Sequence, residues 1–469
     1  MTAIIVSILI IGYIGIATEH ITNINKAAIA MFLGTMGWVL YILYGKNYVL
    51  HFYPEQLSTF LDGAAISMTN IKKFIANEIF VKYVAQLAEI VLFLLATMYI
   101  VEVLNINGCF DFITEWLRTR NGQVLLWALA LTTFLISANL DNLTTTVMML
   151  VIMRQIVSNS RHRMLYGAVI VLAANCGGAF TVIGDVTTLM LWNKEAVTPS
   201  NFSAALFLPS LVALIVPTYL VGRKLPEHIE IESPRTNYRG DDTTLTRWQR
   251  ILMLFVGIGG LWFIPTFRNL TKLPPFVGAL CVLALFWVVN ELCNRKLIRS
   301  EQPVTRMLPR QLQYENLQII LFFIGLSLAV GVIQETGSWR VAAQWCDNNI
   351  HNIYVLSIMM GLLSSVLDNI ALVLSGISIY NVIDPEIVNP ATLTEYGRAF
   401  LPNGQYWHLV AYCGCIGGCL LPIGSVAGYA LMKIENVTIW WFFRHVTGKV
   451  LAGWLAGLGV YFMIDLFIR

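Results

Sequence analysis

The stretch SANLDNLTTT, residues 137–146, decides the fold because it places polar residues inside an apolar run. The flanking residues are largely apolar from Val124 to Ile136 and from Val147 to Ile152. A carboxylate at membrane depth costs about 2.5–3.5 kcal/mol on insertion scales, so Asp141 is a functional candidate by position alone. A similar stretch, SSVLDN, returns at 364–369 inside a second apolar run. We interpret the two stretches as two copies of one half-site.

The composition predicts an all-α polytopic membrane protein. The chain has 469 residues, of which 57% are apolar and only 12% are charged, whereas soluble domains carry about 25% charged residues. A net charge of +3 gives no indication of nucleic-acid binding. The apolar segment 3–17 follows no basic leader, which indicates a retained helix rather than a signal peptide. Because no transit-peptide features are visible, we expect a bacterial inner membrane.

The apolar segments predict ten full crossings, because each approaches the ~20 residues that a spanning helix needs. Amphipathic pieces are expected at 46–79, 109–119 and 339–350. The crossings are expected at 2–17, 26–45, 80–103, 163–192, 203–222, 248–265, 273–294, 316–334, 405–433 and 448–467.

Two pairs of shorter apolar arms predict re-entrant hairpins. The arms 122–136 and 143–157 flank the first polar stretch, and 352–366 and 370–384 flank the second. Each arm has about 15 residues, fewer than a crossing needs. Irregular backbone at this depth is tolerated only where it is buried in protein or faces water. We therefore expect each Asp-Asn pair at the tip of a hairpin.

Two of the crossings are predicted to be broken helices. The segment 163–192 contains Gly177, Gly178, Gly184 and Asp185, which do not suit a continuous lipid-facing helix. The segment 405–433 repeats the pattern. The matching positions are Ser137 with Ser364, Asp141-Asn142 with Asp368-Asn369, Gly177-Gly178 with Gly417-Gly418, and Gly184-Asp185 with Gly424-Ser425.

This duplication predicts inverted repeats. Five full crossings separate the start of one copy from the start of the other, and an odd number turns the second copy upside down. Inverted repeats with discontinuous helices are typical of secondary transporters, whose site lies near the midplane. The predicted organisation is scaffold helices at 1–79, a first repeat at 80–222, a cytoplasmic loop with linking scaffold helices at 223–315, and a second repeat at 316–469.

The basic residues predict the orientation. Most Lys and Arg residues fall on the side that holds 104–121, 158–162, 223–247 and 295–315, which the positive-inside rule assigns to the cytoplasm. Both termini are then periplasmic. The first hairpin opens toward the cytoplasm and the second toward the periplasm.

The hairpin tips and helix breaks together predict a cation site. Carboxylate, hydroxyl and amide oxygens suit a small hard cation such as sodium or lithium. Three carboxylates in one low-dielectric region cannot all remain ionised without a cation, so protons compete with it for the same oxygens. This competition needs no resident cofactor. The predicted site residues are Ser137, Asp141, Asn142, Asn175, Asp185, Thr187, Thr188, Ser364, Asp368, Asn369 and Ser425.

Simpler interpretations exist for several of these residues. One Asp-Asn pair alone could hydrogen-bond a helix kink, but the duplication beside matched glycines argues against this. Ser and Thr often bond to helix carbonyls, so Thr144, Thr145 and Thr146 are weaker candidates. The cysteines Cys413, Cys415 and Cys419 could in principle bind a soft metal. Small thiols also pack well where helices approach closely, and we favour packing.

The combined motifs resemble the NhaD-type sodium/proton antiporters of the ion transporter superfamily, which also holds dicarboxylate and arsenite carriers. The resemblance covers nearly the whole chain and departs from the family pattern at Pro422 and the neighbouring cysteines. The motifs are Glu19-His20 with Asn25-Lys26-Ala27, Asp141-Asn142, Gly177-Gly178 with Ile183-Gly184-Asp185, Leu367-Asp368-Asn369, and Ile423-Gly424-Ser425.

This resemblance implies extrusion of sodium and lithium driven by the proton gradient. It also implies a homodimer in which each subunit has a scaffold domain and a mobile transport domain that moves as an elevator. By motif position it points to Asp141, Asn142, Asn175, Asp185, Thr187, Thr188, Ser364, Asp368, Asn369 and Ser425 as functional residues.

Three functions remain open at this point. The first is a sodium/proton antiporter in which Asp141, Asp185 and Asp368 alternate between proton and sodium. The second is a sodium-coupled carrier of dicarboxylate or another anion, although the Asp in each tip would repel an anion unless sodium binds first. The third is an intramembrane enzyme, which we do not expect because no His-Glu-x-x-His, Gly-x-Ser-x-Gly or phosphate-binding loop accompanies the acids.

Overall fold

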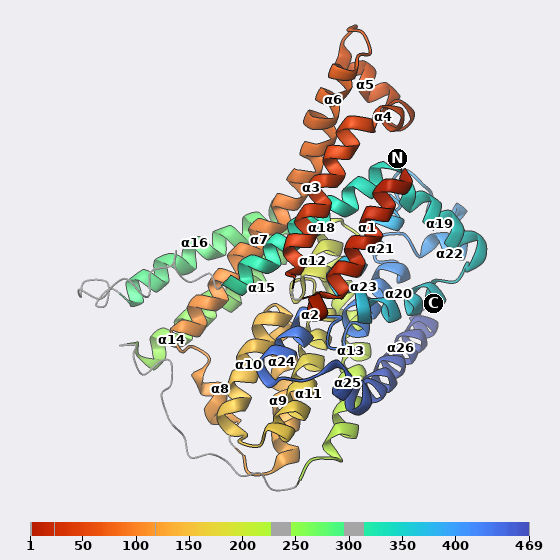
Figure 1. Ribbon diagram of the computed structural model, residues 1–469. Helices are drawn as coiled ribbons and strands as arrows, with labels where there is room; N and C mark the ends of the chain where they lie inside the picture. Colours follow the sequence, from red (N-terminus) through yellow and green to blue (C-terminus); the bar gives the residue numbers. More distant parts are fainter. Residues whose placement is uncertain (1, 23, 118, 227–244, 295–313, 469) are drawn as a thin grey trace. The chain divides into compact units, whose positions relative to one another are not determined.

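The computed structural model describes residues 2–22, 24–117, 119–226, 245–294 and 314–468. All regular structure in these ranges is helical (Figure 1), so the prediction of an all-α protein is confirmed. Most of the predicted loops 223–247 and 295–315 lies outside the described residues.

Seven helical runs in the described part of the chain are long and apolar enough to cross a membrane. The other three expected crossings, 2–17, 163–192 and 405–433, correspond to one shorter helix and two broken helices, so they stay predictions. The seven runs are Lys26–Tyr44, Met68–Ile106, Pro199–Gly222, Arg247–Thr271, Pro275–Cys293, Leu317–Glu335 and Ile439–Phe467.

The chain divides into two compact units. Unit 1 comprises Met1–Leu92, Gln313–Asn352 and Leu374–Asn381, and unit 2 comprises Phe93–Leu312, Ile353–Val373 and Val382–Arg469. The boundaries of the predicted repeats are a separate division of the chain and stay a prediction.

Unit 1 is built around two helices that approach closely. A Cβ atom on Gly34 of α3 would lie 2.5 Å from the carbonyl oxygen of Gly325 on α18. Small residues allow such close contact between apolar helices in a membrane. The helices of this unit are α1 (Thr2–Ala17), α2 (Glu19–Thr22), α3 (Lys26–Tyr44), α4 (Lys46–Phe52), α5 (Pro54–Leu61), α6 (Met68–Phe74), the start of α7 (Val81–Ile106), α18 (Tyr314–Glu335) and α19 (Ser338–Asn349).

Unit 1 also contains a buried carboxylate that no motif indicated. Glu335, at the end of α18, is 5% exposed. It accepts hydrogen bonds from the hydroxyls of Tyr83 at 2.8 Å, Tyr53 at 3.0 Å and Tyr41 at 3.4 Å. Three hydroxyl donors meet at this buried carboxylate, so the cluster joins α3, α7 and α18.

Unit 2 contains the first predicted hairpin and both helix breaks, together with most of the second hairpin. Figure 1 shows α24 beside α10 and α11, as their contacts require. The helices are the end of α7, α8 (Asp111–Trp116), α9 (Gly122–Ser137), α10 (Asn142–Ile156), α11 (Ser160–Ala179), α12 (Val186–Asn193), α13 (Pro199–Gly222), α14 (Arg247–Leu254), α15 (Gly260–Thr271), α16 (Pro275–Cys293), α20 (Ile353–Leu367), the start of α21 (Asn369–Ile379), α22 (Glu395–Arg398), α23 (Gln405–Gly417), α24 (Val426–Glu435), α25 (Ile439–Phe442) and α26 (Gly448–Ile468).

Pairs of consecutive helices lie where the two hairpins were expected, and re-entry into the membrane stays a prediction. α9 and α10 have 16 and 15 residues, and α20 has 15. At 1.5 Å per residue these arms are about 23 Å long, shorter than the ~30 Å hydrocarbon core. The last arm, predicted at 370–384, ends at Ile379, before Asp384-Pro385, whose proline disfavours helix at the residue before it.

The two helix breaks have the same local geometry. Asp185 caps α12 with φ −145° and ψ 149°, and Ser425 caps α24 with φ −146° and ψ 150°. A Cβ atom on Gly178 would lie 2.7 Å from Gly184 O, and one on Gly418 would lie 2.7 Å from Gly424 O. Only glycine fits where the chain returns so close to itself.

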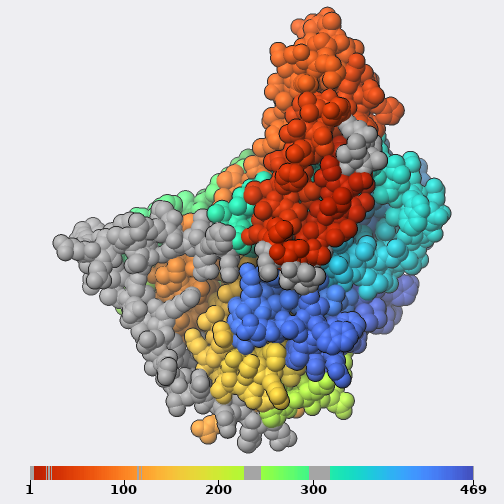
Figure 2. All heavy atoms as spheres, viewed as in Figure 1, coloured from red at the N-terminus to blue at the C-terminus, as the bar shows by residue number. Residues whose placement is uncertain are grey.

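Each hairpin contacts the break that follows it through an equivalent hydrogen bond. Ser137 Oγ donates to Ala174 O at 2.7 Å, and Ser364 Oγ donates to Gly414 O at 2.7 Å. The paired contacts agree with the predicted duplication, while the inverted orientation of the copies stays a prediction. In the space-filling view, the yellow surface of the first hairpin and α11 adjoins the blue surface of the last helices (Figure 2).

The last helical run begins earlier than predicted. The final crossing was expected at 448–467, but α25 and a π-helical turn, Phe443–Thr447, continue directly into α26. The Thr438 side chain caps this run by accepting a hydrogen bond from Trp441 N. The start of the helix was predicted too late because the aromatic segment after the Thr438 cap resembles a belt at the membrane interface rather than part of a crossing.

Candidate cation site

Asp185 is the centre of the polar cluster in unit 2. It lies in the first helix break and is 3% exposed. Its Oδ1 accepts hydrogen bonds from Thr187 N at 2.9 Å and from Thr187 Oγ1 at 3.0 Å. Its Oδ2 accepts from Asn142 Nδ2 at 2.6 Å and from Asn369 Nδ2 at 3.4 Å. The tips of both hairpins therefore donate to one carboxylate oxygen.

Asn175 links this carboxylate cluster to the second helix break. Its Oδ1 accepts from Asn142 Nδ2 at 3.1 Å. Its Nδ2 donates to Val171 O at 2.9 Å and lies 3.4 Å from Ser425 Oγ. Residues from α10, α11, the two breaks and the second hairpin tip thus form one buried network.

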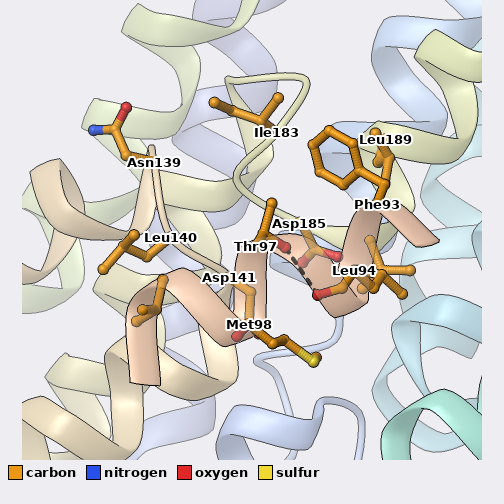
Figure 3. Close-up of a pocket in the computed structure, with 12 residues that line it drawn as sticks. Phe93, Leu94, Thr97, Met98, Asn139, Leu140, Asp141, Ile183, Asp185 and Leu189 are labelled. Atoms are coloured by element: carbon orange, nitrogen blue, oxygen red, sulfur yellow. Dashed lines mark hydrogen bonds between the residues drawn. The ribbon is translucent and has the colours of Figure 1, made fainter. Parts of the chain in front are cut away.

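Asp141 lies beside Asp185 but is bound differently. It caps α10, accepting from Leu143 N at 2.8 Å, from Thr144 N at 3.2 Å and from the Thr144 hydroxyl. Asp141 and Asp185 line one pocket (Figure 3). The two carboxylates therefore face a shared space from different elements.

The same pocket contains residues that the sequence analysis did not single out. Figure 3 shows Thr97 and Met98 of α7 next to the two carboxylates. The Thr97 hydroxyl donates to Leu94 O at 3.1 Å, so its oxygen keeps a free lone pair. One Thr in an apolar helix is a weak sequence signal, which explains why it was missed. The α7 residues of the pocket are Phe93, Leu94, Thr97, Met98 and Val101.

Asp368 occupies the tip of the second hairpin in a left-handed conformation, with φ +68°. It is 3% exposed, and Asp368 Oδ1 accepts from Ile370 N at 3.0 Å. The next residue anchors the tip to the second break, because Asn369 N donates to Gly424 O at 3.0 Å. Asp141 shares a pocket with Asp185, and Asp368 directly precedes Asn369, whose amide donates to Asp185, so the three predicted acids lie in one region.

Several buried oxygens on α10 and α21 lack a hydrogen-bond partner among the described residues. Asn369 Oδ1, Thr145 Oγ1 and Thr146 Oγ1 are enclosed and accept no bond from the described residues. Buried acceptors without partners are rare in folded proteins and need an explanation. A small cation would satisfy such oxygens.

The remaining predicted hydroxyls brace the backbone. Ser137 and Ser364 donate to carbonyls of the following helices, as described above, and Thr188 Oγ1 donates to Asp185 O at 2.9 Å. Their protons are therefore already engaged. They hold the breaks in place.

Comparison with known proteins places the chain in a family. A family model described as citrate transporter matches residues 1–388, which include Asp141, Asp185 and Asp368. Sodium/proton antiporter 1 of Arabidopsis thaliana is 32% identical over 97% of this chain and 71% of that protein. Sodium/proton antiporter 2 of the same plant is 31% identical over 91% of this chain and 99% of that protein. The Na⁺/H⁺ antiporter NhaD of Vibrio cholerae is 29% identical over 81% of this chain and 78% of that protein.

The chain belongs to the citrate transporter family and to its NhaD-type members. The suspected NhaD resemblance is therefore confirmed. The match to the citrate transporter model ends before the second break, whereas the matches to the NhaD-type relatives cover most of the chain. In this NhaD-type member, Ser425 caps the helix after the second break, and the buried Cys413, Cys415 and Cys419 lie on α23 or directly after it.

Proposed function

We propose that this NhaD-type protein exchanges sodium or lithium for protons as a secondary active antiporter. One observation supports this most: Asp185 accepts amide hydrogen bonds from the tips of both hairpins. Because both halves of the chain contact this one carboxylate, whether it holds a proton or a cation can be coupled to the positions of both hairpins. The names of the plant and bacterial relatives support the same exchange.

In the proposed mechanism, Asp141, Asp185 and Asp368 alternate between proton and cation, with Asp185 at the centre of the hydrogen-bond network. Without a cation, the Asn142 and Asn369 amides compensate the carboxylate by donating N–H groups. Rotation of an amide by about 180° presents its oxygen instead, since each Asn side chain carries a donor and an acceptor. The cation then gains these oxygens while Asp185 is deprotonated.

The larger movement is also a proposal. The two hairpins and the two broken helices would move together as an elevator against a scaffold that includes 26–45, 203–222 and 248–265. We further propose a homodimer in a bacterial inner membrane, with both termini periplasmic. Neither part of the proposal requires a resident cofactor, a nucleic acid or an enzymatic step.

The second candidate is sodium-coupled transport of a carboxylate anion. The citrate transporter match favours it. Three acids in one region oppose it, because an anion would approach net negative charge unless sodium binds first. Sodium-dependent uptake of labelled citrate or succinate into proteoliposomes would support this alternative.

The deciding experiment uses the purified protein in proteoliposomes with an internal pH dye. A sodium gradient should drive proton flux in the wild type, and Asp185→Asn and Asp141→Asn should each abolish it. Both variants should still melt cooperatively in detergent, which separates loss of exchange from loss of fold. Full exchange in both variants would contradict the assigned roles.

A further inference from the structure

We infer that Cys415 is a positioning residue that holds the Thr187 hydroxyl against Asp185, a role that rests on the proposed cation exchange. Cys415 Sγ lies 2.9 Å from Thr187 Oγ1, and Thr187 Oγ1 lies 3.0 Å from Asp185 Oδ1. Cys415 and Thr187 are completely buried. A thiol from the second half of the chain therefore reaches the central carboxylate of the first half through one hydroxyl.

The proton arrangement in this chain follows from the available donors. A threonine hydroxyl has one proton to donate. An ionised Asp185 carboxylate can only accept hydrogen bonds, so the Thr187 hydroxyl donates this proton to Asp185. The Thr187 oxygen is then left to accept a hydrogen bond, and the Cys415 thiol is the donor within reach. The order is thus Cys415 to Thr187 to Asp185.

The same two groups fit the protonated state of Asp185. When the carboxyl carries a proton, the Thr187 hydroxyl can turn and donate to the Cys415 sulfur, because a thiol is both a weak donor and a weak acceptor. Cys415 thus keeps Thr187 in place in both states of the site. An alanine would supply neither contact.

Comparison of the two repeats explains why this contact occurs at the first helix break and not at the second. Cys415 stands where the first half has Asn175, since Gly417-Gly418 match Gly177-Gly178. Asn175 reaches across to Ser425 at 3.4 Å, and Cys415 reaches across to Thr187 at 2.9 Å. The position that matches Thr187 is Ala427, which has no hydroxyl. The hydroxyl link to a carboxylate therefore exists only at the first break.

Loss of the thiol should weaken cation binding more than turnover. Without the thiol, the Thr187 hydroxyl keeps Asp185 as its one side-chain partner and rotates more freely about χ1, so it leaves the carboxylate part of the time. Asp185 Oδ1 would then lose one of its two donors, and the oxygens around the cation would be held less firmly. The affinity for lithium should fall more than the affinity for sodium, because a smaller ion needs shorter and better-fixed oxygen distances.

The experiment compares wild type with Cys415→Ala, Cys415→Ser and Cys413→Ala in proteoliposomes. Cys413 is the matched control: it lies on the same helix, is equally buried, and faces Trp454 instead. Cys415→Ala should raise the sodium concentration for half-maximal proton flux about threefold to tenfold, with the maximal rate within about twofold. Cys415→Ser should restore most of the affinity, and Cys413→Ala should match wild type.

Two further measurements keep the inference open to refutation. Sodium-dependent thermal stabilisation of the purified protein reports binding without transport, and Cys415→Ala should need more sodium for the same shift. If that variant does not fold, Cys415→Val fills the space without a donor and should show the same loss. Wild-type affinity and lithium preference in a folded Ala or Val variant would overturn the inference. A wild type without sodium-driven proton flux would instead contradict the proposed function.

Discussion

Arg163 Nε lies 2.9 Å from Glu435 Oε2 and joins the start of α11 to the end of α24. Arg154, at the end of α10, pairs with the other oxygen of Glu435 at 3.1 Å. The Glu435 side chain is 1% exposed, while those of Arg163 and Arg154 are 19% and 49% exposed. One buried carboxylate therefore holds together elements from the two halves of the chain, on helices that continue toward the cation site.

Replacing this carboxylate should destabilise the fold. Glu435→Gln leaves two arginines without their counter-charge, and the free energy of unfolding should fall by about 2–4 kcal/mol. The measurement is thermal or denaturant unfolding in detergent. Glu195→Gln is the matched control, because Glu195 pairs with Arg268 at 3.0 Å but is 81% exposed. That change should cost less than about 1 kcal/mol, and equal losses would contradict the structural role of Glu435.

Sodium affinity should depend on pH through competition. If one proton and one cation share the Asp185 site, the sodium concentration for half-maximal flux should rise about tenfold for each pH unit below the titration of the site. The maximal rate at saturating sodium should stay nearly constant. Proteoliposome fluxes at several pH values check this. If the sodium concentration for half-maximal flux does not change with pH while the maximal rate does, protons act at a place other than the Asp185 site.

The two hairpin amides should contribute unequally. Asn142 Nδ2 lies 2.6 Å from Asp185 Oδ2, and Asn369 Nδ2 lies 3.4 Å from it. Asn142→Ala should weaken sodium affinity about tenfold, and Asn369→Ala should weaken it about threefold, because the longer contact is weaker. The exposed Asn389, which caps a surface turn, provides the control Asn389→Ala. A larger effect at Asn369 would mean that the cation lies nearer the second hairpin.

A glycine at the first break should not tolerate a side chain. A Cβ atom on Gly177 would overlap Phe134 O, a backbone atom that cannot move aside alone. Gly177→Ala should lower the free energy of unfolding by about 1–3 kcal/mol. In the control Gly448→Ala, no atom lies within 4 Å of the added Cβ. Gly448→Ala should be neutral or slightly stabilising, and a neutral Gly177→Ala would refute the close approach.

Local signals explain which features the sequence could predict. The hairpins follow from arm length, because an apolar arm of about 15 residues around a polar tip cannot cross the bilayer. The breaks follow from glycines and an acid inside an apolar span. Asp141, Asn142, Asp185 and Asn369 could be predicted as site residues because a polar side chain is costly inside a membrane. The Asp-Asn pair and the glycine break also each occur twice in the chain.

Other features depended on contacts between distant segments. The sequence around Thr97 does not distinguish it from other polar residues in apolar helices. In the same way, the sequence does not distinguish Cys415 from the neighbouring cysteines. Their roles follow from position, since α7 lines the pocket and only Cys415 of the cluster has Thr187 within hydrogen-bond distance. Sequence periodicity reports burial along one helix, but a hydrogen bond between residues 187 and 415 exists only after folding has brought both helix breaks together.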